Sequence, residues 1–288
     1  MRDITYDNIT DVVLKAYSGT ENKRVRELVG SLIKHMHDYV REVDLTPQEW
    51  EETMNFLLRA AKASSDERNE FILLSDLLGV SALVDLQEAA KDPAATITTV
   101  LGPFYLPGTP EVPYGANLIG DNDGERILVR GQIKNTAGQP VPNARIEVWQ
   151  NANNGLYKVQ DPEAPEHNLR ATLHCDDQGR YCFATIAPIA YEVPDDAAGG
   201  ELIHAAGRHC WRPAHVHMMI TADGYKRHIT QVFNEDDPYI DGDAVFGVRA
   251  PLAISWQRKP SNEDVAQHPD IEQPFNVVEA DFVLAKAG

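Results

Sequence analysis

The sequence predicts an α+β protein in which an N-terminal helical domain is followed by an antiparallel β-sandwich. Two features predict this class. Apolar residues recur at helical spacing over residues 1–95, and after residue 125 short stretches alternate between apolar and polar side chains. The chain has 288 residues, which is enough for two domains that each bury a core. We expect a helical domain over residues 1–95, a linker to about residue 125, and a sandwich domain within residues 96–288.

The helical region contains several segments with helix signals. One segment places its apolar residues three and four positions apart, on one helix face: Val25, Leu28, Val29, Leu32, Ile33 and Met36. A second segment begins at Thr46-Pro47-Gln48-Glu49, which combines an N-cap Thr, a Pro at the first helical position and a Glu at the third. Residues 69–78 and 80–90 continue the pattern on either side of Gly79. Helices with this much apolar surface usually pack against a partner, so we expect a homodimer through this domain.

Residues 96–125 are rich in Pro and Gly and also contain Val100, Leu101, Phe104 and Tyr105. This linker is either simply packed or forms one wall of a pocket, since pockets commonly lie between domains. Alternation then predicts strands at residues 127–133, 144–149, 180–184, 214–220, 229–233 and 275–284. Strands at this spacing, without helices between them, favour an antiparallel sandwich or barrel.

Composition excludes several classes of protein. A net charge of −18 argues against binding to nucleic acid. No apolar run is long enough to cross a bilayer, and the acidic start does not resemble a signal peptide, so we expect a cytoplasmic protein with no membrane partner. The chain has three cysteines without Cys-x-x-Cys spacing, which predicts reduced thiols rather than disulfides or a thiolate zinc site.

The stretch after Pro213 suggests a metal site. His215 and His217 alternate with apolar residues, so in a strand both imidazoles point to the same side and can bind a transition metal. The alternative is a polar pair on the hydrated face of a strand. His35 and His37 have the same spacing within a predicted helix, where the two side chains are about 200° apart and cannot share an ion.

Two tyrosines could complete such a site. Tyr157 follows the turn Asn153-Asn154-Gly155-Leu156, and Tyr191 lies in a loop that leads toward the histidine strand. Phenolate is a hard anionic donor that suits ferric iron. A single Tyr in a loop is more often a packed aromatic residue with its hydroxyl hydrogen-bonded, so the residues alone leave both interpretations open.

Taken together, these residues resemble a known family. The stretch Gly207-Arg208-His209-x-x-Arg212-Pro213-Ala214-His215-x-His217, with Pro188-x-x-Tyr191 and Gly155-Leu156-Tyr157 before it, is similar to the signature of the intradiol ring-cleaving dioxygenases. Residues 73–85, 99–105 and 191–196 are similar to the hydroxyquinol-cleaving branch of that family. The resemblance runs from the first helices to about residue 255.

The resemblance implies one non-haem Fe(III) per subunit, bound in the sandwich domain by Tyr157, Tyr191, His215 and His217. It also implies that Tyr191 leaves the metal and accepts a substrate proton. Arg212 would stabilise negative charge on the substrate ring, although a surface Arg on an acidic protein is the alternative. Gln231 would orient the site, although a Gln bonded to strand backbone is nearly as common.

The implied substrates are a small aromatic diol and O2, with hydroxyquinol (1,2,4-trihydroxybenzene) opened to 3-hydroxy-cis,cis-muconate, the enol form of maleylacetate. Catechol or chlorocatechol is the alternative substrate, and a non-catalytic β-sandwich binding module is the alternative outside the class. Positions that match the family's substrate pocket are Leu73, Asp76, Val100, Gly102, Pro103, Phe104, Val193, Pro194, Arg212 and Val245. Asp76 either accepts a hydrogen bond from the third ring hydroxyl or faces water. The resemblance further implies a phospholipid at the dimer interface.

Overall fold

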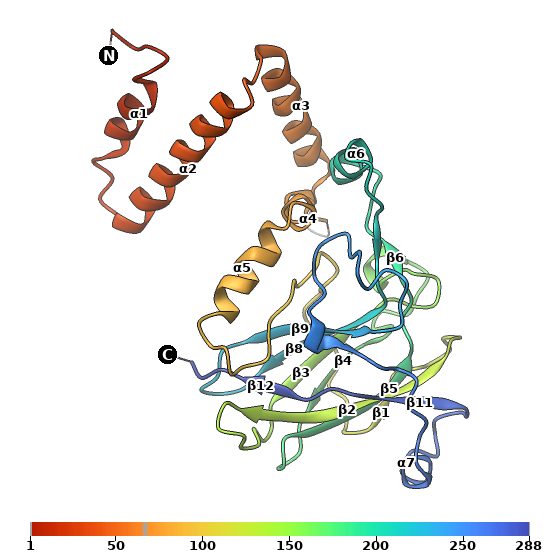
Figure 1. Ribbon diagram of the computed structural model, residues 1–288. Coiled ribbons are helices and arrows are strands. Elements are labelled where there is room, and N and C mark those ends of the chain that lie inside the picture. Colours follow the sequence, from red (N-terminus) through yellow and green to blue (C-terminus); the bar gives the residue numbers. More distant parts are fainter. Residues whose placement is uncertain (1, 66–67, 288) are drawn as a thin grey trace. The chain divides into compact units, whose positions relative to one another are not determined.

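The computed structural model describes residues 2–65 and 68–287 (Figure 1). The chain divides into two compact units, and the boundary in the sequence falls between Leu58 and Arg59. The first unit contains α1 (Ile9–Tyr17), α2 (Lys23–Glu42) and most of α3 (Pro47–Ala63). The second unit contains every strand and the remaining helices within residues 2–65 and 68–287. The predicted domain boundary near residue 95 stays a prediction.

Two helices of the first unit, α2 and α3, lie where periodicity and capping signals predict them. Asn22 caps α2, because its side-chain oxygen accepts hydrogen bonds from the backbone N–H groups of Arg24 and Val25 at 2.9 and 3.1 Å. The predicted start of α3 is confirmed, since Thr46 and Glu49 each bind the other's backbone N–H. Along α2 several large apolar side chains are exposed: Val25, Leu28, Leu32, Met36, Tyr39 and Val40.

Among the described residues, the second unit contains four further α-helices: α4 (Glu70–Leu77), α5 (Val80–Ala89), α6 (Ala198–Ala205) and α7 (Asn262–Gln267). Asn69 caps α4 through hydrogen bonds from the N–H groups of Phe71 and Ile72, both 3.1 Å long. Gly79 separates α4 from α5 with a left-handed backbone (φ 70°), as expected for a Gly between two helices. Packing of α4 against α6 brings the buried Glu70 carboxylate 2.7 Å from the N–H of Gly199.

Two five-stranded sheets form the body of the second unit (Figure 1). One sheet has the order β1-β5-β2-β11, with β12 also pairing with β2, and comprises β1 (Ala116–Asn117), β2 (Arg126–Asn135), β5 (Arg180–Ile186), β11 (Phe275–Glu279) and β12 (Phe282–Leu284). The other has the order β10-β9-β8-β3-β4 and comprises β3 (Arg145–Trp149), β4 (Arg170–His174), β8 (His215–Thr221), β9 (His228–Asn234) and β10 (Ala253–Ile254). A two-stranded ribbon joins β6 (Tyr191–Glu192) to β7 (Trp211–Arg212).

The two sheets pack face to face around one apolar core. This core contains Val129 of β2 and Phe183 of β5 from one sheet, with Ile146 of β3 and Val216 of β8 from the other. The predicted α+β class is therefore confirmed, and so are the predicted strands, except that the single strand expected over residues 275–284 is divided into β11 and β12. The central pairings are antiparallel, but β1, β10, β11 and β12 join their neighbours in parallel. Alternation of side chains reports the face of a strand and not its direction, so these parallel pairings were not foreseeable.

The strand β8 is buried on both of its faces. Val216, Met218 and Ile220 point into the core between the sheets. The alternate residues His215, His217 and Met219 point away from that core and are also buried, because loops and aromatic residues cover the outer face. All three cysteines of the chain are free and buried, as predicted.

Candidate iron centre and active site

Strand β8 brings its two histidines together. The Nε2 atoms of His215 and His217 are 3.1 Å apart, and each residue is only 1% exposed. The Nδ1 atom of His215 lies 2.7 Å from the carbonyl oxygen of Pro213, which fixes the orientation of that ring. The two imidazoles therefore lie on the same side of the strand, as predicted. Their burial rules out the alternative of a hydrated strand face.

A row of three side chains crosses the sheet at the level of His217. Trp149 on β3 and Gln231 on β9 are the direct strand neighbours of His217, so all three point to the same face. The Trp149 indole stacks on the imidazole, with ring centroids 4.7 Å apart and an interplanar angle of 11°. Gln231 Nε2 lies 3.2 Å from His217 Nδ1 and donates to the carbonyl oxygen of Val100 at 2.9 Å. The His217 ring is thus held by both neighbouring strands.

Tyr157 comes from the connection between β3 and β4, immediately before the short helix η1 (Lys158–Gln160). Its hydroxyl oxygen lies 3.2 Å from His215 Nε2, and the residue is 2% exposed. Phe104 from the linker stacks on the Tyr157 ring, with centroids 4.6 Å apart. The linker therefore forms part of the wall around this cluster.

Tyr191 lies on β6, directly opposite Arg212 on β7. The guanidinium Nη1 of Arg212 donates to the Tyr191 hydroxyl at 3.3 Å and lies equally far from His215 Nε2. The Tyr191 ring meets the Tyr157 ring edge to face, with centroids 5.4 Å apart. The β6–β7 ribbon thus brings the second tyrosine and the arginine to the two histidines.

Arg212 is fully buried and held by a carboxylate that sequence reasoning missed. Asp243 accepts from Arg212 Nε at 2.9 Å and from Nη2 at 3.2 Å, while Gln231 Oε1 accepts from Nη2 at 2.9 Å. Burial lowers the pKa of the guanidinium, but the Asp243 carboxylate, together with Tyr191 and Tyr157, outweighs this effect and leaves it raised. Burial raises the pKa of Asp243, but Arg212, together with His215 and the Gly247 N–H, more than offsets it. The pair is therefore charged, which excludes the alternative of Arg212 as a surface residue.

Gly247 makes this close packing possible. A Cβ atom at that position would lie 2.7 Å from Arg212 Nη2 and 2.9 Å from Asp243 Oδ2. Gly102 plays a similar part beside His217, because its backbone has φ +75° and a Cβ would approach His217 Cε1 to 3.4 Å.

The protonation states of the cluster match the needs of a cation site. Burial lowers the pKa of His215 to about 3, and the Arg212 charge adds to this effect. Burial also holds the pKa of His217 well below its usual value. Both imidazoles are therefore neutral and can offer a lone pair. Burial raises the pKa of Tyr157 well above its usual value, so its phenolate needs a nearby cation.

This donor set fits ferric iron. Two imidazole nitrogens and a phenol oxygen lie within 3.2 Å of a neighbouring donor, a spacing typical of ligands around one small ion. A second phenol oxygen lies beside them, 3.3 Å from Arg212 Nη1. Oxygen anions together with imidazole suit trivalent iron, which would also supply the charge that a buried phenolate requires.

A cavity of about 380 Å³ opens next to this cluster. Among the predicted substrate positions, Leu73, Pro103, Phe104 and Pro194 line it. Val100, Val193 and Val245 do not line it but pack with Leu73 in a buried apolar cluster. Among the described residues, the lining includes none of the four candidate iron ligands, nor the predicted substrate positions Asp76, Gly102 and Arg212. Phe104 connects the two places, because it lines the cavity and stacks on Tyr157.

Asp76 on α4 is 3% exposed, which excludes the alternative that it faces water. Burial raises the pKa of its carboxyl group, and a hydrogen bond with Ser81 opposes that effect in part. An acid in such a place gains from an additional hydrogen-bond donor.

Comparison with known proteins assigns the family. Residues 100–284 match the family model described as "Dioxygenase", and residues 22–96 match "Catechol dioxygenase N terminus". The chain belongs to the intradiol ring-cleavage dioxygenases. Membership of this enzyme family rules out the alternative of a non-catalytic binding module.

Individual members of the intradiol dioxygenases match over nearly the whole chain. The 6-chlorohydroxyquinol 1,2-dioxygenase of Cupriavidus pinatubonensis is 40% identical, over 90% of this chain and 94% of that protein. The hydroxyquinol 1,2-dioxygenase of Rhizobium sp. is 39% identical, over 96% of this chain and 94% of that protein. A solved structure of hydroxyquinol 1,2-dioxygenase from Pseudomonas putida DLL-E4 has a TM-score of 0.90 and 41% identity, covering 98% of this chain and 99% of that one.

In this intradiol dioxygenase, none of the helices within residues 2–65 and 68–287 has the length and apolar character of a membrane span.

Proposed function

We propose that this chain is an iron(III) hydroxyquinol 1,2-dioxygenase, with one ferric ion per subunit held by Tyr157, Tyr191, His215 and His217. The observation that carries the proposal is the convergence of Tyr157, His215 and His217 donor atoms within 3.2 Å of a neighbouring donor, beside a cavity that Phe104 lines. Relatives of similar length from Rhizobium and Pseudomonas putida bear that activity in their names. The reaction adds both atoms of O2 to the diol and gives 3-hydroxy-cis,cis-muconate.

When bound, ferric iron supplies the Lewis acidity that binds adjacent hydroxyls as a dianion and makes the ring carbon open to attack by O2. The surrounding residues prepare that chemistry. Tyr191 takes a proton from the substrate at its phenol oxygen, to which Arg212 Nη1 donates a hydrogen bond of 3.3 Å. Arg212, fixed by Asp243 and Gln231, then faces the negative charge that develops on the ring. Burial of the cluster excludes water from these steps.

Asp76 selects the substrate with the third hydroxyl. A buried carboxyl that can accept a hydrogen bond favours hydroxyquinol over catechol, because catechol leaves that acceptor without a donor. Leu73, Pro103, Phe104 and Pro194 provide the apolar walls. Val100, Gly102, Val193 and Val245 support them from behind, with Gly102 packed against His217.

Metal analysis together with turnover tests the proposal. We expect about one iron per chain and a visible absorption band from phenolate-to-iron charge transfer, which Tyr157→Phe weakens. Hydroxyquinol should be cleaved faster than catechol at equal concentration. Asp76→Asn should reduce that preference by about 10- to 100-fold, the worth of a hydrogen bond to a charged group.

Asp85→Asn is the matched control, because Asp85 is a partly buried acid on α5 whose pKa burial also raises, but the cation that acts on it is Arg249 and not Arg212 of the candidate iron centre. It should leave the preference unchanged. A colourless protein after iron loading, or faster cleavage of catechol, would contradict the proposal.

We further infer a cytoplasmic homodimer built through the helices of residues 1–95. The exposed apolar side chains of α2, among them Leu28, Leu32 and Met36, support this inference, since such a face gains from being covered. The three reduced cysteines suit a cytoplasmic location. Sedimentation of the wild-type chain and of Leu32→Glu tests the dimer, and lipid extraction of the purified protein tests whether a phospholipid is bound with it.

A further inference from the structure

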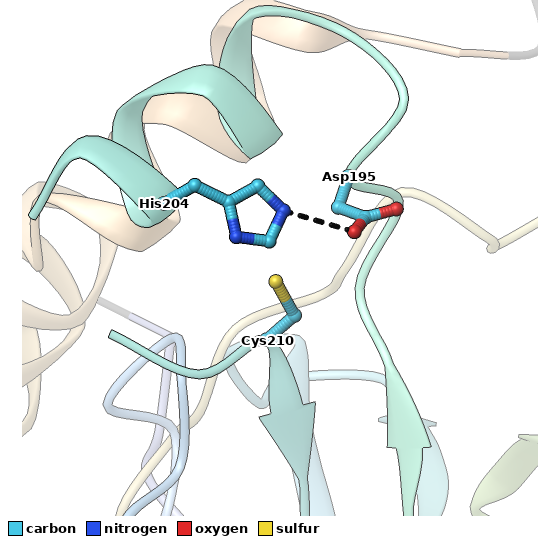
Figure 2. Close-up of side chains that lie close together, drawn as sticks. All are labelled: Asp195, His204 and Cys210. Carbon is cyan, nitrogen blue, oxygen red and sulfur yellow. Dashed lines mark hydrogen bonds and ion pairs between the residues drawn. The ribbon is translucent and has the colours of Figure 1, made fainter. Parts of the chain in front are cut away.

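A second group of metal-binding side chains lies apart from the candidate iron centre. Asp195 follows β6, His204 lies near the end of α6, and Cys210 precedes β7 (Figure 2). One ligand atom from each residue lies within 4.8 Å of those of the other two. The Cys210 sulfur points toward the His204 ring and the Asp195 carboxylate, as Figure 2 shows.

The three donors are held to different degrees. Cys210 is 4% exposed and fixed by the hydrogen bond from Val193 N–H to its carbonyl oxygen at 2.9 Å. The side chains of His204 and Asp195 are 59% and 49% exposed, and His204 Nε2 lies 3.0 Å from Asp195 Oδ2. Donors of a tetrahedral zinc ion lie about 3.3–3.8 Å from one another. The two exposed side chains can reach that spacing by small rotations, with the sulfur as the fixed point.

Neighbouring charges favour a cation at this place. Arg68 binds Asp196 through two hydrogen bonds of 2.7 and 3.0 Å, so Asp195 is the acid that faces His204. Burial raises the pKa of the Cys210 thiol, and the carboxylates of Asp195 and Glu192 raise it further, with a smaller opposing effect from the Arg208 guanidinium. A cation would relieve that accumulation of negative charge.

A nucleophilic role for Cys210 fits this environment poorly. Reactive thiols have a lowered pKa and lie in electropositive, accessible surroundings. Cys210 is buried among carboxylates and its pKa shifts in the opposite direction. A thiol, an imidazole and a carboxylate from three separate elements are instead the ligand types of zinc and its chemical relatives.

We propose that Asp195, His204 and Cys210 form a binding site for a zinc-class divalent cation at the rim of the substrate cavity. On binding, the thiol gives up its proton to solvent and the sulfur joins the metal as a thiolate, with no change in oxidation state. The fourth position of the ion is left for water. Asp195 also lines the cavity of about 380 Å³, so the site and the cavity share a wall.

Cobalt(II) added to the iron-loaded protein tests the site, because a cobalt thiolate absorbs in the near ultraviolet. We expect one cobalt per chain in addition to the iron, release of one proton, and displacement of the cobalt by zinc. Cys210→Ser should abolish the absorption. His204→Asn should weaken cobalt binding by at least about tenfold, since even lost support around a metal costs that much.

His35→Asn is the matched control, because it removes an exposed imidazole on α2 and should change nothing. The exposed His204 side chain keeps the test decisive even if Cys210→Ser folds poorly. No cobalt uptake by the wild-type protein would overturn the proposal. So would cobalt uptake by the Cys210 and His204 variants that equals that of the wild type.

A consequence for ring cleavage rests on the proposed function. A bound ion would join α6 to both strands of the ribbon that carries Tyr191 and Arg212, and would remove negative charge from the cavity rim. Zinc should therefore change KM for hydroxyquinol by about threefold or more in the wild type and not in Cys210→Ser. An unchanged KM with cobalt visibly bound would overturn this coupling. If the protein cleaves no diol at all, the cobalt absorption still decides the site.

Discussion

The chain contains the motif His-x-His twice, and the two copies differ in the direction and the burial of their side chains. On β8, His215 and His217 point to the same side, with their Nε2 atoms 3.1 Å apart and their side chains buried. On α2, His35 is exposed, and His37 turns to another face, where its Nδ1 lies 3.0 Å from Thr10 Oγ1. The comparison teaches that the period of the backbone, and not the pair of residue types, decides whether the motif can bind a metal.

Burial accounts for the second half of the difference. The β8 pair lies among Trp149, Tyr157 and Arg212, which remove water and keep both imidazoles neutral. The α2 pair has no such cover. Only the buried pair therefore combines the two requirements of a metal site, which are donors on one side and imidazoles that carry a lone pair at neutral pH.

Replacing one histidine in each copy of the motif tests this comparison. Of the predictions made here, it has the largest expected effect on iron content and activity. His217→Asn should remove most of the iron and lower kcat/KM by at least about 1,000-fold, because one of four donors and its stacking on Trp149 are lost. His35→Asn should retain iron and activity. Iron content by atomic absorption and initial rates measure both. Equal loss of iron and activity in the two variants would contradict the conclusion that only the β8 pair binds the metal.

Asp243→Asn tests how much the buried residues around the β8 pair contribute to catalysis. The amide keeps the shape of the side chain but no longer balances the Arg212 charge, so the guanidinium loses its fixed orientation. We expect kcat to fall by about 100-fold, while iron content stays near that of the wild type. Asp241→Asn, an exposed acid two positions earlier, is the control for the change in charge. A fall in KM alone would contradict a role in positioning Arg212.

His228 on β9 extends the comparison to a buried histidine outside the cluster. Burial lowers its pKa from 6.5 to about 4, and its Nε2 has no hydrogen-bond partner among the described residues. The unfolded chain therefore binds a proton between pH 6.5 and 4 that the folded chain does not, so stability falls as the pH drops through this window. Denaturant unfolding should show the wild type losing about 2 kcal/mol more than His228→Leu between pH 7 and pH 5. Parallel losses would show that His228 does not contribute.

His37→Ala is expected to have the smallest effect. It removes the contact with Thr10, which is worth about 1 kcal/mol of stability at most, and leaves iron and turnover unchanged. Thermal unfolding together with an iron assay measures both. Loss of iron in this variant would mean that the α2 histidines have a role beyond packing.

Much of the fold was accessible from the sequence because local patterns report it. Periodicity and the capping residue Thr46 marked the helices, and alternation marked the central strands. The short strands β6 and β7 were not predicted, since two residues carry no pattern. Their pairing brings Tyr191 opposite Arg212 and so decides the geometry of the site.

The candidate site was predicted in part for the same reason. The placement of His215 and His217 on one side of a strand follows from alternation, whereas Tyr157 and Tyr191 came from the family resemblance. All four stay proposals as ligands. Asp243 was missed because it follows Arg212 by 31 positions and lies in a loop without a motif. Its one available signal was the need of a buried arginine for a carboxylate.

The row of Trp149, His217 and Gln231 across β3, β8 and β9 has a consequence for how this protein can vary. A single residue added to any of these strands would turn every following side chain of that strand to the opposite face. Insertions and deletions in natural or engineered variants of this chain should therefore be confined to the loops. Shuffling experiments that join homologues inside these three strands should succeed only where the crossover keeps the count of residues.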